Sequence, residues 1–338
     1  MLNKNGVLII AELSANHNGS LDLAKKTIIA MKEAGADAVK LQTYTPDTIT
    51  LNCKNDYFKI NQGTLWDGRT LYDLYAEAMT PWEWHKELFD LIESLGMIYL
   101  SSPFDSSAVD FLENLNVPAF KIASFEITDV NLIKYAASKQ KPMIISTGIA
   151  TIEDIELAIK TCKSASNNQI TLLKCTSSYP APIDGLNLLT IADMKAKFGC
   201  EVGLSDHTMD TVAPIVAVAL GATVIEKHFI IDRKLGGADS GFSLEPDEFK
   251  KMVLQVRQAE KALGKISYEL DKKALKSKEF SRSLFVAKDI KKGEIFTREN
   301  IRSVRPSFGL HPKYLDEVLG KYATNDMQMG EPLRFQIK

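Results

Sequence analysis

Cysteines, long apolar runs and glycine-rich phosphate loops are scarce or missing in this sequence of 338 residues. The four cysteines are scattered without a CxxC pair, so they indicate reduced thiols in the cytoplasm and not a disulfide framework. No apolar run approaches the roughly 20 residues that cross a bilayer. Without a glycine-rich loop of the nucleotide-binding kind, an anionic ligand would be held mainly by side chains, which argues against ATP as the substrate.

An excess of charge of one sign is also missing. The 41 Lys and Arg residues nearly balance the 43 Asp and Glu residues, for a net charge of −2. We therefore expect neither nucleic acid nor an anionic membrane surface as a partner. The start of the chain does not resemble a secretory signal, because its apolar stretch, residues 7–11, is too short.

What the sequence does contain is a regular alternation of apolar segments with helical patterns. Several of the helical patterns stop at a glycine, such as Gly35, Gly96 and Gly264. This rhythm predicts an α/β fold of the (β/α)₈ or TIM-barrel type, in which the chemistry lies at the C-terminal ends of the strands. The predicted strands are residues 7–13, 38–44, 98–104, 119–124, 143–148, 170–176, 202–207 and 224–229.

The pattern predicts a catalytic barrel over residues 1–264, with one interruption. Residues 44–80 greatly exceed the usual barrel connection and carry several aromatic side chains, so we interpret them as a functional loop at the barrel mouth. After the barrel, residues 265–280 form a charged linker and residues 281–338 a small β-rich module. A module of this size is marginal alone, and we expect it to dock on another surface.

Histidines close the last two predicted strands. His207 and His228 follow apolar strand residues, and neighbouring strands lie about 5 Å apart. A single histidine would be interpreted as a hydrogen-bonded core residue. The pair instead predicts an open site for a divalent ion acting as a Lewis acid, with Mn²⁺ as the first choice and Mg²⁺ or Co²⁺ as alternatives.

Lysines also lie inside the predicted strands. Lys40 and Lys121 are costly there unless each meets a carboxylate or an anionic ligand. The simple alternative is a salt bridge inside the barrel, for instance between Lys40 and Glu12. Hydroxyl groups close to both lysines in the sequence favour a phosphate or carboxylate site.

Short motifs follow one another in a set order along the chain. In the barrel they are residues 11–19, 39–43, 101–104, 121–124, 146–148, 179–180, 203–208 and 226–229. The ordered set resembles the nonulosonic (sialic) acid synthase family over essentially the whole chain. The C-terminal module resembles the antifreeze-like (SAF) domain of that family, through residues 288–293 and 304–306. Residues 43–46, 63–67, 80–85 and 305–312 resemble its pseudaminic acid synthase branch.

The resemblance implies a synthase that condenses phosphoenolpyruvate with an open-chain N-acetylated amino sugar and releases phosphate. It assigns the metal to His207 and His228. It assigns proton handling to Glu12 and Glu126, without choosing between the two carboxylates. By the same resemblance, phosphoenolpyruvate is bound by Lys40, Gln42, Ser102, Lys121, Ser124, Ser146 and Ser205.

The resemblance also implies which residues contact the sugar. Ser177, Tyr179 and Asp239 match sugar-contacting positions, and Arg305 matches an arginine that the SAF domain supplies. The sialic acid branch has an asparagine where this chain has Ser177, which counts against N-acetylmannosamine and favours 2,4-diacetamido-2,4,6-trideoxy-altrose. A domain-exchanged homodimer is implied, with Arg305 acting either in cis or in trans.

Other interpretations remain open at this point. An N-acetylneuraminate or legionaminate synthase would share the chemistry and differ in the sugar. Another metal-dependent barrel enzyme, such as an aldolase, would need neither the SAF-like module nor Arg305. A non-catalytic binding protein would have little use for buried lysines beside a histidine pair.

Overall fold

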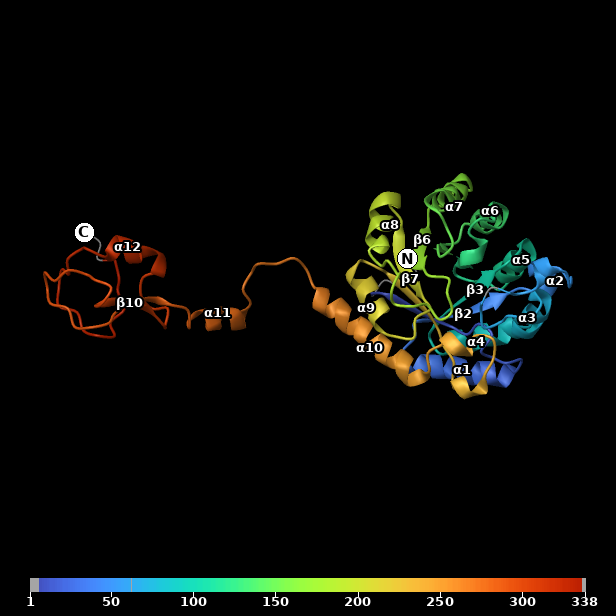
Figure 1. Cartoon of the computed structure of the whole chain (residues 1–338), viewed down its shortest axis with the longest axis horizontal. Helices are drawn as coiled ribbons and strands as arrows, with labels where there is room; N and C mark the ends of the chain where they lie inside the picture. The colour runs from blue at the N-terminus through green and yellow to red at the C-terminus, as the bar shows by residue number, and fades with distance from the viewer. Residues whose placement is uncertain (1–5, 62, 336–338) are drawn as a thin grey trace. The chain divides into compact units, whose positions relative to one another are not determined.

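The computed structural model describes residues 6–61 and 63–335. The chain divides into two compact units, residues 1–264 and residues 265–338, which Figure 1 colours from blue to orange and from orange to red. No helix among the described residues is long and apolar enough to cross a membrane.

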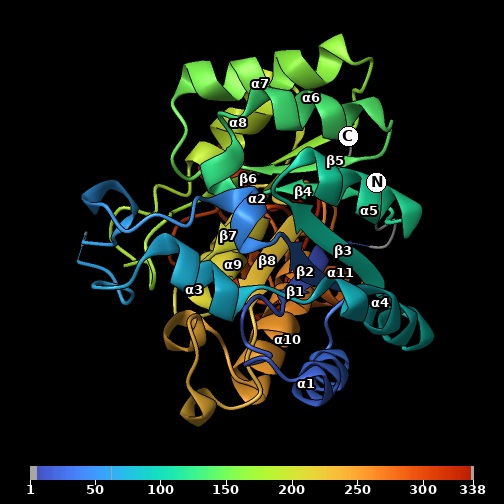
Figure 2. The ribbon, with the colours of Figure 1, turned by 90° about the vertical axis from the view of Figure 1, so that its right-hand side faces the viewer.

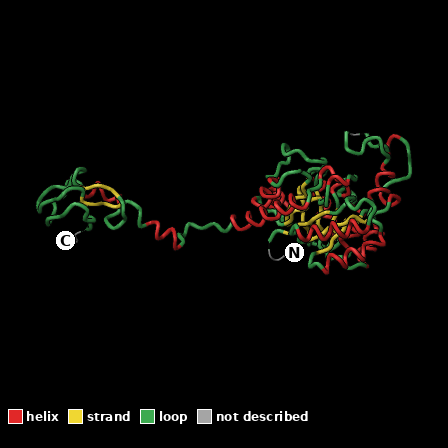
Figure 3. The backbone as a smooth tube through the Cα atoms, turned by 90° about the horizontal axis from the view of Figure 1, so that it is seen from below, coloured by secondary structure: helices red, strands yellow, loops and turns green. Residues whose placement is uncertain are grey.

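The first unit is a closed barrel of eight parallel strands, which confirms the predicted TIM barrel. Strand β1 pairs with β2 on one side and with β8 on the other, so that its last residue, Glu12, lies between Lys40 and His228. Figures 2 and 3 show the strands enclosed by helices. The strands are β1 (Leu8–Glu12), β2 (Ala38–Thr43), β3 (Ile98–Pro103), β4 (Phe120–Ile122), β5 (Met143–Ser146), β6 (Ile170–Cys175), β7 (Glu201–Asp206) and β8 (Val224–His228).

The helices around the barrel begin at side chains that cap their free backbone N–H groups. Ser20 accepts a hydrogen bond from Leu23, and Thr151 and Asp154 form a reciprocal capping box. A short 3₁₀ turn, η2 (Trp82–Trp84), comes immediately before the helix that starts at residue 85. The helices are α1 (Leu21–Glu33), α4 (His85–Ser94), α5 (Ser106–Asn114), α6 (Val130–Ser138), α7 (Ile152–Ser164), α8 (Thr190–Phe198), α9 (Val212–Ala219) and α10 (Pro246–Leu263).

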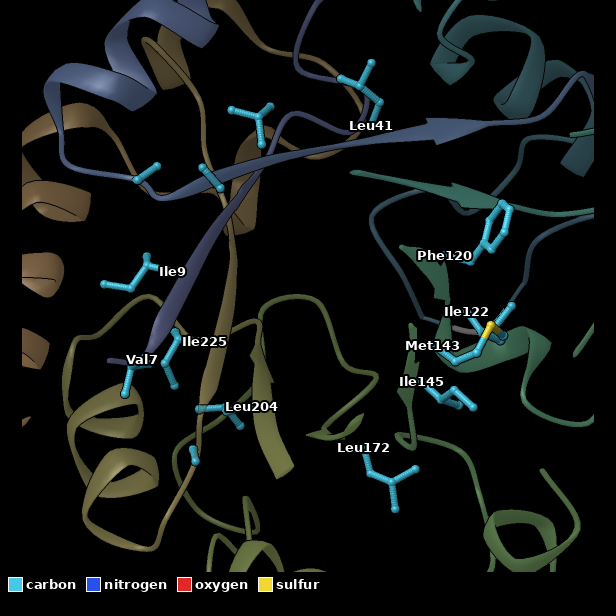
Figure 4. Packing of buried hydrophobic residues seen from close by; sticks show 14 of the residues in the cluster. Val7, Ile9, Leu41, Phe120, Ile122, Met143, Ile145, Leu172, Leu204 and Ile225 are labelled. Atoms are coloured by element: carbon cyan, nitrogen blue, oxygen red, sulfur yellow. The ribbon is translucent and has the colours of Figure 1, made fainter. Parts of the chain in front are cut away.

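Alternation along each strand separates two apolar layers. Ile9 and Ile225 belong to the large layer between the strands and the helices, part of which Figure 4 shows. Ile10 belongs to a smaller layer inside the barrel. Because successive side chains of a strand point to opposite faces, Glu12 points inward like Ile10, two residues before it. Because of this alternation, the polar side chains at the C-terminal ends of the strands that follow the inward-facing positions lie inside the barrel.

The long connection between β2 and β3 contains structure that the sequence analysis did not predict. It includes α2 (Pro46–Ile49), the 3₁₀ turn η1 (Asp56–Phe58) and helix α3 (Leu71–Ala78). Thr70 caps the start of helix α3, because its side chain accepts a hydrogen bond from the backbone N–H of Asp73. At eight residues, α3 is too short for its period to stand out in the sequence, since a helix this short owes its stability to packing and capping.

The second unit has its own small core. Helix α11 (Lys272–Lys278) lies in the predicted charged linker, and β9 (Ser283–Val286) pairs antiparallel with β10 (Ile301–Val304). Ile290 and Ile295 form only isolated bridges, to Met327 and Tyr322. Residues 318–329 likewise make no more than isolated bridges, since α12 (Leu315–Val318) and a turn at Gly320 come at the start of this segment.

Candidate active site

A cavity of about 510 Å³ opens at the C-terminal ends of the barrel strands. The side chains that the sequence analysis selected converge on it, apart from Ser102 and Arg305. Those that line it are Glu12, Lys40, Gln42, Lys121, Ser124, Glu126, Ser146, Ser177, Tyr179, Ser205, His207, His228 and Asp239.

The floor of the cavity carries two buried lysines that are interleaved with carboxylates. Lys40 Nζ lies 2.6 Å from Glu12 Oε2, and Lys121 Nζ lies 3.1 Å from Glu226 Oε1. Burial alone would raise the pKa of Glu12, but Lys40 and the neighbouring cations outweigh it and hold that pKa well below its usual range. The barrel salt bridge between Lys40 and Glu12 is therefore present, and it coexists with the cavity.

Four buried polar atoms of residues that line the cavity have no hydrogen-bond partner among the described residues. They are Glu126 Oε2, Ser146 Oγ, Glu226 Oε2 and His228 Nδ1. Buried polar groups in folded proteins are almost always paired. These unpaired atoms are consistent with a polar or charged ligand that completes their hydrogen bonding.

The two histidines face each other across the β7–β8 pair. Their ring centroids lie 5.4 Å apart, and Phe242 packs edge-on against His228 at 4.9 Å. Burial lowers the pKa of His207 to about 3, with a further contribution from His228, so the His207 imidazole is neutral at pH 7. His207 Nδ1 lies 3.0 Å from the carbonyl oxygen of Thr176; since a carbonyl only accepts, Nδ1 carries the proton and Nε2 keeps its lone pair.

This donor set fits a divalent metal ion. His207 offers an unprotonated ring nitrogen, and a carboxylate oxygen of Glu12 lies 3.7 Å from His228 Nε2. Imidazole nitrogens with oxygen donors suit Mn²⁺ and other divalent first-row ions. Among the described residues, no group of three or more histidine, cysteine, aspartate and glutamate side chains is arranged so that it could hold a metal ion, so the candidate ligands are the two histidines.

Pairing between β7 and β8 positions these histidines. Asp206 pairs with Lys227 in the register of the two strands, immediately before His207 and His228. Their side chains point to the opposite face from the histidines, where the ammonium group of Lys227 binds the carboxylate of Asp206 and the backbone carbonyl of Thr208. Lys227 is fully buried. The ion pair links the two strand ends behind the histidines.

A serine cluster forms another side of the cavity. Ser177 Oγ donates to Ser124 Oγ at 3.0 Å, and Ser124 Oγ also accepts from the backbone N–H of Ile149 at 3.1 Å. A Cβ atom at Gly148 would lie 2.3 Å from Ser177 Oγ and 2.7 Å from Ser124 Oγ, so glycine is required there for both hydroxyls to keep their places.

Comparison with known proteins decides the family. Residues 27–268 match the model of the NeuB family, and residues 281–336 match that of the SAF domain. The chain belongs to the NeuB family. The prediction of an enzyme of the nonulosonic acid synthase family is thereby confirmed.

Individual relatives of this NeuB-family chain extend over its full length. It is 53% identical to a pseudaminic acid synthase of Campylobacter jejuni, over 97% of this chain and 95% of that protein. It is 40% identical to an N,N'-diacetyllegionaminic acid synthase of the same species, over 97% of this chain and 98% of that protein. The crystal structure of the spore coat polysaccharide biosynthesis protein SpsE of Bacillus subtilis superposes with a TM-score of 0.67 at 35% identity, covering 98% of this chain and 94% of that one.

Two selected residues of this NeuB chain do not line the cavity. Ser102 is fully buried, and its hydroxyl accepts a hydrogen bond from Lys40 Nζ at 3.4 Å. Ser102 therefore contacts Lys40, which lines the cavity, but does not line the cavity itself. Arg305 lies in the second unit, where it is exposed. Gln42 does line the cavity, but its amide already donates to Glu12 Oε1 at 2.7 Å and to Ser14 Oγ at 2.9 Å.

The cavity also contains residues that the sequence analysis did not select. Ser14 donates its hydroxyl proton to Asp239, and Phe242 contacts both His207 and His228. Glu226 completes the charged floor between the lysines. The inward direction of Glu226 was readable from its two-residue spacing to His228. Ser14 lies in a turn and Phe242 in a three-residue 3₁₀ helix, and neither segment has a strand period.

The carboxyl group of Glu126 predicts a pH dependence of stability. Burial raises the pKa of Glu126 from 4.5 to about 7, and its Oε2 has no hydrogen-bond partner among the described residues. Because the folded chain holds this proton more tightly than the unfolded chain, the group's contribution to the free energy of unfolding falls as the pH rises between those two values. In the wild-type chain, this group should lower the free energy of unfolding by on the order of 2 kcal/mol between about pH 5 and about pH 8. We expect Glu126→Gln to lack this decrease, as measured by urea unfolding at the two pH values.

A control for this prediction is Glu156→Gln, which changes an exposed carboxylate on α7. That variant should keep the wild-type dependence of stability on pH. An unchanged dependence in Glu126→Gln as well would show that Glu126 is not the group that titrates.

Proposed function

We propose that this chain condenses phosphoenolpyruvate with open-chain 2,4-diacetamido-2,4,6-trideoxy-altrose to form pseudaminic acid and inorganic phosphate. The observation that carries the proposal is the pairing, in one cavity, of a lysine-rich polar floor with two neighbouring histidines. The higher identity to a pseudaminic acid synthase than to a legionaminic acid synthase favours this sugar. A legionaminate or N-acetylneuraminate synthase is the alternative.

In the proposed reaction the floor binds phosphoenolpyruvate. Lys40 and Lys121 supply positive charge for its phosphate and carboxylate groups, and Ser146 Oγ is a free donor beside them. Ser124 and Ser205, which also line the cavity, add hydroxyl groups. The role of Glu12 is to keep Lys40 oriented through the 2.6 Å ion pair, while its second oxygen accepts from Gln42.

The bond-forming step needs an electrophilic aldehyde next to carbon 3 of phosphoenolpyruvate. A divalent ion bound by His207 and His228, Mn²⁺ in our proposal and Mg²⁺ or Co²⁺ otherwise, would polarise the aldehyde oxygen as a Lewis acid. Carbon 3 then attacks the aldehyde carbon, water adds at carbon 2, and cleavage of the C–O bond releases phosphate. Glu126, with its pKa raised to about 7 by burial, is placed to exchange a proton with the reacting water or the sugar.

The sugar is proposed to lie against Ser177, Tyr179 and Asp239. The Tyr179 ring lies 4.5 Å from that of His207, and Asp239 is held by Ser14 and by the backbone N–H of Ala15. At position 177 the sialic acid branch has the side-chain amide of an asparagine. This chain has the hydroxyl group of Ser177 instead, which already donates a hydrogen bond to Ser124. The proposals that Arg305 contacts the sugar, that the chain forms a domain-exchanged homodimer, and that it works in the cytoplasm all stay predictions.

The test is phosphate release from phosphoenolpyruvate in the presence of Mn²⁺ with a panel of amino sugars. We expect kcat/KM for 2,4-diacetamido-2,4,6-trideoxy-altrose to exceed that for N-acetylmannosamine by at least about tenfold, the effect of one lost pocket contact of about 1.4 kcal/mol. The reverse order of the two sugars would reject the pseudaminic acid assignment and leave the family chemistry intact. Reactions without a sugar provide the blank.

A further inference from the structure

Helix α3 presents an apolar stripe to the cavity and not to the barrel core. Leu71, Leu74, Tyr75 and Ala78 line the cavity. Their spacing of three, four and seven residues places them on one face of the helix. None of the four belongs to the hydrophobic clusters that fill the barrel or join it to its helices. The stripe is therefore a wall of the cavity.

The polar side chains of α3 make their contacts outside this stripe. Tyr72 donates to Asp47 Oδ1 of α2 at 3.2 Å, and Arg69 forms a 2.6 Å ion pair with Glu77. These polar contacts leave the apolar stripe of α3 directed at the cavity.

Trp66 extends the wall toward the segment that follows β8. Its indole Nε1 donates to the carbonyl oxygen of Ala238 at 2.9 Å, next to Asp239. Its ring lies 5.8 Å from Tyr179 and 6.4 Å from Phe242. The hydrogen bond joins the connection between β2 and β3 to the far side of the mouth, so Trp66 and α3 enclose one end of the same cavity.

The cavity thus has two chemically different halves. The floor offers Lys40 and Lys121 to an anion, whereas the wall of α3 and Trp66 offers mainly carbon atoms. An apolar wall left against water is unfavourable, and covering it with methyl groups is favourable. The proposed sugar carries three methyl groups, one in each of its two acetamido groups and one at carbon 6.

We propose that Leu71, Leu74, Tyr75 and Trp66 form a methyl-binding subsite, which selects the acetylated 6-deoxy sugar over sugars with a hydroxyl at carbon 6. This inference rests on the proposed function and names the part of the chain that decides its substrate. The residues of α3, Trp66 and the two lysines proposed to bind phosphoenolpyruvate all line the same cavity. This supports the sugar as the occupant of the apolar wall, since the two substrates must meet in one cavity.

The expected selectivity follows from the size of the groups involved. Burying one methyl group changes kcat/KM by about fourfold, or about 0.8 kcal/mol. A hydrophobic pocket rejects an added hydroxyl by up to roughly 100-fold. We therefore expect the wild-type chain to prefer the 6-deoxy sugar over its 6-hydroxy counterpart by roughly 10-fold to 100-fold.

The experiment compares Leu71→Asn and Leu74→Asn with a matched control, Leu51→Asn. Leu51 lies in the same connection, is 65% exposed and does not line the cavity. For each protein, kcat/KM is measured with the 6-deoxy and the 6-hydroxy sugar at saturating phosphoenolpyruvate, and thermal melts report folding. We expect the preference to fall at least fivefold in Leu71→Asn and Leu74→Asn with the KM for phosphoenolpyruvate unchanged, and to persist in Leu51→Asn.

Two negative outcomes are distinguishable. If the wild-type chain turns over the diacetamido sugar but Leu71→Asn keeps the wild-type preference, the methyl-binding subsite is wrong and the proposed function stands. If the wild-type chain releases no phosphate with that sugar, the proposed function itself fails. Leu71 is only partly buried, so its variant decides the question even if Leu74→Asn does not fold.

Discussion

Substitution of His228 by alanine is expected to abolish metal-stimulated phosphate release. The variant leaves His207 as the remaining imidazole at the mouth, and we expect the affinity for Mn²⁺ to fall by at least about 100-fold, since the loss of even an outer partner of a metal ligand costs 10-fold to 100-fold. The fold should survive, because His228 Nδ1 has no hydrogen-bond partner among the described residues. Calorimetric titration with Mn²⁺ measures the affinity directly, without reference to turnover.

His311→Ala is the matched control for this change. His311 is exposed in the second unit, and its removal should alter neither Mn²⁺ affinity nor turnover. Wild-type rates in His228→Ala, or undiminished rates of the native chain after chelation of divalent ions, would reject the proposed Lewis-acid role of the metal.

The second large effect is expected from Lys227→Met. The ammonium group of Lys227 binds Asp206 and the backbone carbonyl of Thr208, and lies 3.2 Å from Thr208 Oγ1. Lys227 and Asp206 are both buried, so removal of the cation leaves an uncompensated carboxylate. Breaking a buried ion pair in this way costs about 3–5 kcal/mol, a large part of the stability of an ordinary domain. Urea unfolding monitored by circular dichroism measures it.

A double variant separates the ion pair from the packing around it. Adding Asp206→Asn to Lys227→Met removes the unpaired charge while keeping a side-chain acceptor for the backbone N–H of Thr208, 3.0 Å from Asp206 Oδ1. We expect the double variant to regain at least half of the lost stability. Lys86→Met, which breaks an exposed pair with Asp90 on α4, should have no measurable effect. A stable Lys227→Met would show that the buried pair contributes little.

The sequence was informative wherever the period of a strand decides the direction of a side chain. Lys40 and His228 lie in predicted strands, and the structure places both side chains at the cavity. Strand periodicity carried no information about Ser14, which lies in a turn, or about Phe242, which lies in the 3₁₀ helix η5 (Ser240–Phe242). Helix α3 was missed because its apolar face serves a cavity and not the core, and because eight residues make a weak periodic signal.

The sequence alone determined the barrel, its strand order and the set of polar residues at the strand ends, because these depend on local period and on the geometry of parallel strands. Only the tertiary structure decided which polar groups are paired. In the structure, the side chain of Gln42 donates a hydrogen bond to Glu12, that of Ser177 to Ser124 and that of Lys227 to Asp206. The tertiary structure also brought α3 and Trp66 to the mouth. These contacts join segments far apart in the chain, and no local spacing encodes them.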